Sequence, residues 1–240
     1  MLAVQHMSRT FNEGKAGFRN ISFNIRQAEI IGILGTSGCG KSTLLRVLSG
    51  LDPHYQGQFS SESTRNIGMM FQEPRLMPWL SVMDNVCFGS KHSNQKHLAK
   101  ELLKLVGLNG YEGYYPKDLS GGMAQRTAIA RSLITEPEVL LLDEPFSALD
   151  AFTKMQLQDV LLDIWERRRT TMVLVTHDID EALYLCDRIF ILRGQPGELY
   201  EEIQINEQKP RSRGDASLAV KKDEILGLLD LNNKKKEAVP

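Results

Sequence analysis

The stretch Gly35-Thr-Ser-Gly-Cys-Gly-Lys41-Ser42 constrains the fold of this chain more than any other feature. It matches the pattern G-x-x-x-x-G-K-[ST], with an apolar run (28–34) before it and a helix-forming run after it. The glycines let successive backbone N–H groups turn inward toward phosphate groups. Lys41 would add positive charge there, and the Ser42 hydroxyl can bind Mg²⁺. The pattern predicts a nucleotide-binding strand–loop–helix unit, but it does not separate kinases, GTPases and ATPases.

Apolar runs alternate with helical patterns along the rest of the chain, which predicts a mixed α/β core. We expect strands at 21–25, 28–34, 66–71, 139–142, 172–175 and 189–192, and helices from residue 41, at 151–168 and at 179–186. Residues 81 to about 131 have helical spacing, which predicts a helical subdomain (about 72–136) inserted in a domain of residues 1–206. Residues 207–240 are polar and basic, and predict a surface tail with one short helix at 223–231.

Composition excludes several classes of protein. The 240 residues carry a formal net charge of −1, which gives no drive toward nucleic acid or an anionic membrane. The sequence contains no run of eighteen or more apolar residues, the length needed to span a bilayer. The first residues lack a signal-peptide pattern. Cys39, Cys87 and Cys186 lack the spacing of a metal site, so we expect a reducing cytoplasm and no disulfide.

Two adjacent acids, Asp143 and Glu144, follow the apolar run that ends at Leu142. Ligands bind at the carboxyl ends of parallel strands, so Asp143 is a candidate for Mg²⁺ and Glu144 for the general base that polarises a water. The alternative is a strand end with two solvated acids. His177 and Gln72 follow other predicted strands and are weaker candidates for contact with a phosphate, a water or Mg²⁺, since a lone histidine is more often structural.

A second Gly-rich turn, Leu119-Ser-Gly-Gly-Met-Ala-Gln-Arg126, opens a predicted helix. The free N–H groups and the positive end of a helix dipole can hold an anion. The chain therefore has two predicted phosphate-binding turns but one predicted nucleotide pocket.

Together these motifs resemble those of the ATP-binding-cassette (ABC) ATPases, over nearly all of residues 4–192. The order is Walker A (35–43), Q-loop (Gln72), signature (119–126), Walker B (ending at Asp143-Glu144), D-loop (147–150) and switch histidine (His177). The resemblance implies a P-loop NTPase core of ABC type with an antiparallel β subdomain and a helical insertion.

The resemblance also implies a role for each matching residue. Glu144 would be the general base, His177 the γ-phosphate switch, and Ser42, Gln72 and Asp143 the Mg²⁺ ligands. ATP would be held by Gly35, Ser37, Gly38, Cys39, Gly40, Lys41, Ser42 and Thr43 of one chain, and by Ser120, Gly121, Gly122 and Asp150 of the motifs that serve a dimer. Cys39 occupies a variable position of the loop, and we do not expect its thiol to be catalytic.

Two positions bear on details of the site. Phe11 stands where the family has an aromatic side chain under adenine, and stacking suits its chemistry, with core packing as the alternative. Ala28 precedes Glu29 where the family usually has glycine, and alanine costs little there if φ is negative.

The segment 70–86, with Pro78-Trp79, is similar to the nitrate, sulfonate and taurine importer ATPases, as are 193–197 and 209–211. This implies import of a small anion driven by ATP and Mg²⁺. The alternatives are the ATPase of an export complex or, less favoured, a soluble ABC protein of DNA repair or translation, which usually has a long coiled-coil insertion or two cassettes.

The implied partners are a second ATPase subunit, a separate transmembrane permease and, indirectly, a solute-binding protein, with no nucleic acid. Residues 72–86 would form the groove that receives the permease, where Trp79 or Phe88 could add apolar contact if exposed. The implied location is peripheral, on the cytoplasmic face of the membrane.

Overall fold

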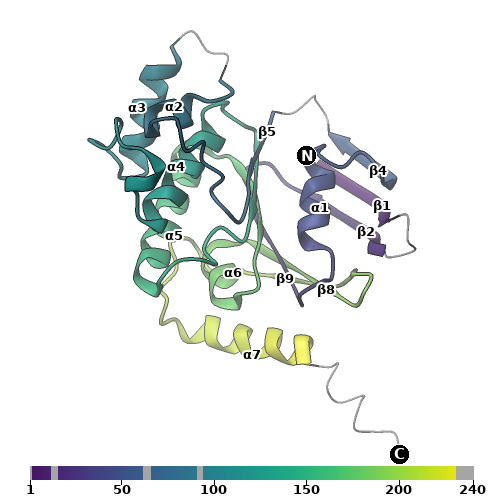
Figure 1. The fold of residues 1–240 in the computed structure, drawn as a ribbon. Coiled ribbons are helices and arrows are strands. Elements are labelled where there is room, and N and C mark those ends of the chain that lie inside the picture. The colour runs from purple at the N-terminus through teal and green to yellow at the C-terminus, as the bar shows by residue number, and fades with distance from the viewer. Residues whose placement is uncertain (1, 12–15, 62–65, 91–93, 231–240) are drawn as a thin grey trace, which may run out of the picture. The chain divides into compact units, whose positions relative to one another are not determined.

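A computed structural model describes residues 2–11, 16–61, 66–90 and 94–230 (Figure 1). The chain divides into two compact units. The first unit contains residues 26–29 and 61–173, and the second unit contains residues 2–25, 30–60 and 174–240. The boundary between them falls inside strand β7.

The described residues of the second unit form two groups of strands and three helices. Strands β2 (Ala16–Ile25), β1 (Leu2–Thr10) and β4 (Gln56–Ser61) form a sheet in that order, with β1 and β2 antiparallel. Strand β3 (Ile30–Gly35) pairs in parallel with β8 (Arg188–Arg193), which pairs antiparallel with β9 (Glu198–Gln204). The helices are α1 (Lys41–Leu48), α6 (Ile179–Leu185) and α7 (Ala216–Asp230). The sheet of β1, β2 and β4 matches the expected antiparallel β subdomain.

The first unit contains a parallel pair of strands and most of the helices. Strands β5 (Ile67–Met70), β6 (Val139–Asp143) and β7 (Thr171–Val175) are neighbours in that order, and β5 runs parallel to β6. The helices are α2 (Val82–Cys87), α3 (Gln95–Leu105), α4 (Gly121–Leu133) and α5 (Ala151–Arg168), with a 3₁₀ turn η1 (Pro116–Asp118). Helices α2, α3 and α4 gather at one end of the unit and form its helical part (Figure 1).

The central strands are buried on both faces, as their apolar sequences predict. Every residue of β3, β6 and β7 is buried. A parallel strand covered on both sides needs a continuous apolar run, which explains why these strands do not alternate polar and apolar residues. In each unit these buried strands form part of the core from which the loops at the strand ends extend.

The structure has every predicted strand and helix, with some differences in bounds and number. Strands β1, β4 and β9 were not predicted as separate elements, and α7 begins at Ala216 instead of 223. The helical stretch from residue 81 is three α-helices and a 3₁₀ turn. All three cysteines are free thiols, as expected.

The start of the predicted polar tail is packed and not solvated. Lys209 Nζ lies 2.8 Å from Asp187 Oδ2, and Arg211 Nη1 donates to the carbonyls of Leu183 and Cys186 at 2.9 and 2.8 Å. The last carbonyls of a helix lack partners within it, so buried Arg211 satisfies the end of α6. The expected surface tail is therefore wrong for these basic residues, while 231–240 lie outside the described residues.

Ala28 adopts a left-handed backbone conformation, with φ of +57°. Alanine was expected to cost little here only if φ were negative, so the structure does not meet that condition. Two contacts hold the turn in this conformation: the Ala28 N–H donates to Thr171 Oγ1 at 3.0 Å, and Trp165 Nε1 donates to the Ala28 carbonyl at 2.8 Å.

We expect Ala28→Gly to raise the free energy of unfolding by roughly 0.5–1 kcal/mol, because a Cβ is strained at positive φ. Urea unfolding followed by circular dichroism measures the change. Ala219→Gly in α7, where φ is not positive, is the matched control and should lower stability by about 1 kcal/mol. Lower stability of Ala28→Gly would contradict the strain at Ala28.

Candidate functional site

The phosphate loop connects β3 to α1 in the second unit, as the motif predicts. β3 ends at Gly35 and α1 begins at Lys41, with Gly40 as its N-cap at φ +89°. A Cβ at Gly40 would lie 2.0 Å from the Gly17 carbonyl oxygen, which allows no side chain. The first N–H groups of α1 therefore follow directly from a tightly packed turn, as an anion-binding helix end requires.

Lys41 is buried, and its ammonium group lies on the carbonyls of the phosphate loop. Nζ donates to the carbonyl oxygens of Gly35 at 2.8 Å and Thr36 at 3.1 Å. Its charge is thus held within the loop, where a bound phosphate would need it. Burial raises the pKa of the neighbouring Cys39 thiol, although Lys41 opposes this, so the thiol is protonated and no nucleophile.

A loop from the far end of the chain supports the phosphate loop. Gln195, between β8 and β9, donates from Nε2 to the Ser37 carbonyl at 3.1 Å. Gly197 bonds through its carbonyl to the Arg19 N–H at 2.8 Å, and a Cβ on it would lie 1.9 Å from the Cys39 oxygen. Sequence reasoning missed Gln195, since nothing in a single sequence pairs residues so far apart.

Phe11 and Thr43, the last residue of the phosphate motif, both lie next to Gly17. A Cβ added to Gly17 would lie 3.1 Å from Thr43 Cγ2 and 3.3 Å from Phe11 Cε2. The Phe11 ring and the end of the phosphate motif therefore both pack against Gly17. Phe11 is 41% exposed, which argues against the core-packing alternative.

His177 is exposed and follows the end of β7. The N–H of the preceding residue, Thr176, donates to the Ile33 carbonyl at 3.3 Å. Since Ile33 lies two residues before Gly35, His177 follows β7 at the same edge at which the phosphate loop leaves β3.

In the first unit the structure brings Gln72 and Glu144 together. Gln72 Nε2 lies 3.4 Å from Glu144 Oε2 and 3.3 Å from Ser147 Oγ. Glu144 has a φ of +45°, a strained conformation for a residue with a side chain, and such strain is concentrated at functional sites. The weaker candidate, Gln72, therefore contacts the candidate general base directly.

Gln125 of the signature motif connects this pair to helix α4. The side chain is buried, and its Nε2 donates to the Gln72 carbonyl at 3.2 Å and to the Pro145 carbonyl at 3.0 Å. The Q-loop and the end of Walker B are thus tied to the helix of the signature motif. Sequence reasoning included Gln125 in the motif but assigned it no role.

The signature turn caps helix α4 as predicted. Ser120 is the N-cap, and its Oγ accepts from the Met123 N–H at 3.3 Å. A Cβ on Gly122 would lie 2.5 Å from Thr153 Cγ2, whereas one on Gly121 would meet nothing closer than 3.9 Å. Gly122 is thus required by packing against α5, while packing does not explain Gly121.

The remaining candidates in the first unit are two aspartates. Asp143 is buried at the carboxyl end of β6. Asp150 is the N-cap of α5 and accepts from the N–H groups of Phe152 and Thr153 at 3.1 and 3.0 Å. The hydrogen bonds from Thr153 hold the pKa of Asp150 below its ordinary value. Asp150 therefore caps helix α5, and its expected contact with the nucleotide of a dimer stays a prediction.

The candidate metal ligands of this chain suit Mg²⁺ better than a metal ion whose ligands are all protein side chains. No group of three His, Cys, Asp or Glu side chains able to hold a metal occurs among the described residues. Mg²⁺ needs few protein oxygens, because it keeps waters and binds substrate phosphates. The hydroxyl of Ser42, the amide oxygen of Gln72 and the carboxylate of Asp143 are ligands of that kind.

The phosphate loop between a buried parallel strand and a helix defines a P-loop nucleotide-binding protein. A sequence model of the ABC transporter family matches residues 18–147, more than half of the chain. The chain belongs to the ABC transporter family and is an ABC-type ATPase. None of the helices that the structure describes combines the length and the apolar character of a membrane-spanning segment.

Two relatives are named as import proteins for sulfonates. The chain is 47% identical over 213 residues to the aliphatic sulfonates import ATP-binding protein SsuB 2 of Pseudomonas syringae pv. tomato, covering 89% of this chain and 91% of that protein. It is 46% identical over 215 residues to SsuB of Bacillus thuringiensis subsp. konkukian, covering 86% of each.

Solved structures of ABC cassettes share the fold. The dimeric cassette MJ0796, in a post-hydrolysis state bound to ADP and Pi, has a TM-score of 0.75 at 30% identity, covering 87% of this chain and all of that one. The cbiO1 subunit of Clostridium perfringens, part of the transporter complex cbiONQ, has a TM-score of 0.78 at 26% identity, covering 96% and 94%.

Proposed function

We propose that this chain hydrolyses ATP to power the import of a small organic sulfonate anion through a separate membrane permease. The observation that carries the choice of solute is the 46–47% identity, over most of both chains, to ATP-binding proteins of aliphatic sulfonate import. The phosphate loop and the Gln72–Glu144 pair support the chemistry.

In this proposal the second unit binds the nucleotide. Lys41 moves from the carbonyls of Gly35 and Thr36 to the β- and γ-phosphates, because a phosphate outcompetes neutral carbonyls for an ammonium group. The N–H groups of residues 37–43 donate to the same phosphates, and Phe11 stacks on adenine. His177 follows a strand end at the edge of the phosphate loop, which suits a contact with the γ-phosphate.

The first unit supplies the base. Glu144 accepts a proton from the attacking water, while the contact of Gln72 Nε2 with Glu144 Oε2 keeps the carboxylate in position. Ser42, Gln72 and Asp143 would be the protein ligands of Mg²⁺, and the ion would supply positive charge for the phosphates.

A second copy of the chain completes each site in this proposal. Ser120 and the N–H groups of Gly121 and Gly122 would donate to the γ-phosphate bound by the other copy. The absence of a packing reason for Gly121 supports a close approach of the backbone to a ligand. A second copy would explain why the chain has two phosphate-binding turns but one nucleotide pocket. The dimeric structure of the related cassette MJ0796 supports such an arrangement.

Exposed aromatic side chains of the first unit suit a permease partner. Trp79 is 71% exposed and Phe88 is 52% exposed, on either side of the short helix α2. A contiguous exposed apolar patch marks an interaction site, and the proposed permease contact requires these two side chains to contribute to one. The proposal also includes a peripheral location on the cytoplasmic face of the membrane and a solute-binding protein that delivers the anion to the permease.

We expect deletion of the gene to abolish growth on an alkanesulfonate as sole sulfur source, and to leave growth on sulfate unchanged. A plasmid copy of the wild-type gene should restore growth, whereas Glu144→Gln should not. Unchanged growth of the deletion strain on alkanesulfonates and taurine would contradict sulfonate import. A selective loss of growth on nitrate as nitrogen source would instead identify nitrate as the imported anion.

A further inference from the structure

Arg9 and Asp52 form a close ion pair beside the candidate adenine platform. Arg9 Nε lies 2.7 Å from Asp52 Oδ2, and the two side chains are only 13% and 18% exposed. Partial burial raises the pKa of Asp52, but the hydrogen bonds from Arg9 and the His54 N–H outweigh it and bring the pKa below its ordinary value. The carboxylate is therefore charged at neutral pH, and the pair orients the Arg9 guanidinium.

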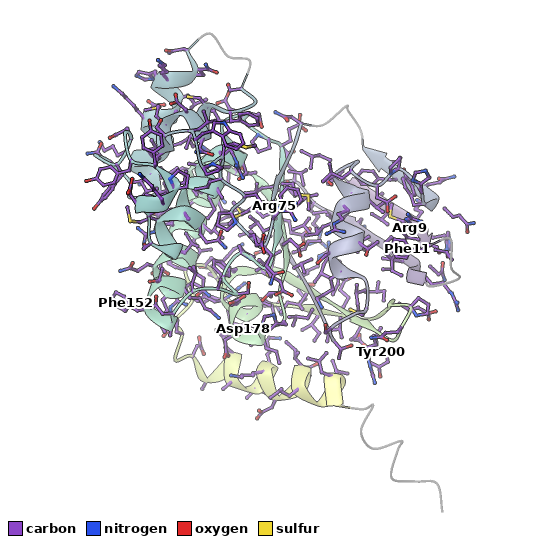
Figure 2. The ribbon with its side chains drawn as sticks, viewed as in Figure 1. Arg9, Phe11, Arg75, Phe152, Asp178 and Tyr200 are labelled. Carbon is purple, nitrogen blue, oxygen red and sulfur yellow. The ribbon has the colours of Figure 1, made fainter. Side chains whose placement is uncertain are left out.

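The guanidinium of Arg9 lies over the ring of Phe11. Its Cζ lies 4.5 Å from the centroid of the Phe11 ring, a cation–π contact, and Figure 2 shows the two side chains next to each other at the end of β1. Arg9 Nη1 also donates to the Thr10 carbonyl at 2.5 Å, so the guanidinium is held by three partners. The ring of Phe11 therefore rests against a fixed planar cation.

The same contacts connect Phe11 to the helix of the phosphate loop. The Asp52 N–H donates to the Arg46 carbonyl at 3.1 Å, and Arg46 belongs to α1, which begins at Lys41. The chain of contacts therefore runs from α1 through Asp52 and Arg9 to the Phe11 ring. The position of the aromatic ring is thereby set relative to the phosphate-binding end of α1.

We propose that Arg9, anchored by Asp52, is a positioning residue that holds Phe11 for adenine and so selects a nucleotide over a simple polyphosphate. This inference rests on the proposed adenine-binding role of Phe11. Arg9 covers one face of the ring, and the 41% exposure of Phe11 leaves room for a base. Pre-ordering the ring lowers the entropy lost when the base stacks, and the cation polarises the ring toward the electron-rich purine.

The test compares the affinities of the full-length chain for MgATP and for magnesium tripolyphosphate, which lacks the base, by isothermal titration calorimetry. Arg9→Met keeps an unbranched apolar stem but removes the charge and the planar donor group. We expect it to weaken ATP binding about fivefold. Tripolyphosphate affinity should change less than twofold, because the phosphate loop is untouched.

Two matched variants separate positioning from folding. Arg9→Lys keeps a cation that can pair with Asp52, but not the stacked plane, and should recover part of the lost ATP affinity. Asp52→Asn leaves Arg9 over the ring without its ion pair, and should lower ATP affinity less than Arg9→Met. Melting temperatures measured alongside show whether any variant has lost its fold.

Phe11→Ala distinguishes failure of the inference from failure of the proposed adenine site. The platform requires this variant to lose about tenfold in ATP affinity and nothing in tripolyphosphate affinity. If Phe11→Ala binds ATP normally, Phe11 is no adenine platform. If Phe11→Ala loses affinity while Arg9→Met does not, or if Arg9→Met loses ATP and tripolyphosphate equally, the positioning role of Arg9 is wrong.

Discussion

Glu144→Gln is expected to lower ATP hydrolysis at least a hundredfold while leaving ATP binding intact. An amide cannot accept the proton of the attacking water, yet it keeps the size of the side chain and its contact with Gln72. Because hydrolysis no longer separates the two copies, the variant should accumulate as an ATP-bound dimer. Phosphate release and light scattering measure the two effects.

Glu138→Gln is the matched control for this prediction. Glu138 is an exposed carboxylate that directly precedes β6, the strand that Glu144 follows, so the two substitutions remove the same charge from opposite ends of the strand. We expect the control to hydrolyse ATP at the wild-type rate and to form no stable dimer. A Glu144→Gln variant with wild-type turnover would show that another group is the general base.

Ser120→Arg is expected to abolish ATP hydrolysis and to leave ATP binding by the separate chain within about twofold. The side chain is exposed at the N-terminus of α4, where a bulky cation would keep the signature turn away from a nucleotide bound by another copy. Nucleotide titration and phosphate release measure binding and turnover separately.

Ser120→Ala is the matched control because it removes the same helix cap without adding bulk. Loss of the hydrogen bond from the Met123 N–H to Ser120 Oγ should cost about 1 kcal/mol of stability in both variants. Only Ser120→Arg should block hydrolysis completely. If Ser120→Arg lost ATP binding in the separate chain, the turn would serve its own chain's nucleotide, and the role proposed for a second copy would be wrong.

The core strands and the phosphate loop could be predicted because their signals are local. A continuous apolar run and a glycine pattern each lie within a short stretch of sequence, so each predicts its strand or loop without knowledge of tertiary contacts. Strands β1 and β9 lack such a signal. The pairing of β1 with β2 shifts register between Val4 and Met7, which breaks the alternation, and β9 is mostly exposed, with only Ile203 buried.

The basic segment at 209–211 shows why charge alone predicts burial poorly. Lys and Arg clusters usually indicate a solvated end, but here Arg211 satisfies carbonyls at the end of α6, and Lys209 pairs with Asp187. A single sequence does not show which helix end such a side chain will reach.

The candidate site was predictable as a set of residue types but not as a set of contacts. The sequence placed Gln72, Glu144 and the signature turn in one family pattern, while the structure adds Gln125, which joins the Q-loop to α4. Arg9 and Asp52 are 43 residues apart, and no motif includes either. Residues that position others are therefore the part of the site that required the structure.

In the proposed mechanism, each complete site combines the phosphate loop of one copy with the signature turn of another. The most direct test mixes two inactive variants, Lys41→Ala and Ser120→Arg, and measures ATP hydrolysis. In a mixed dimer, one site has an intact phosphate loop from one chain and an intact signature turn from the other. With half of the dimers mixed and one of two sites complete in each, we expect about a quarter of wild-type activity. Activity that stays at the level of the separate variants would contradict a site shared between two copies.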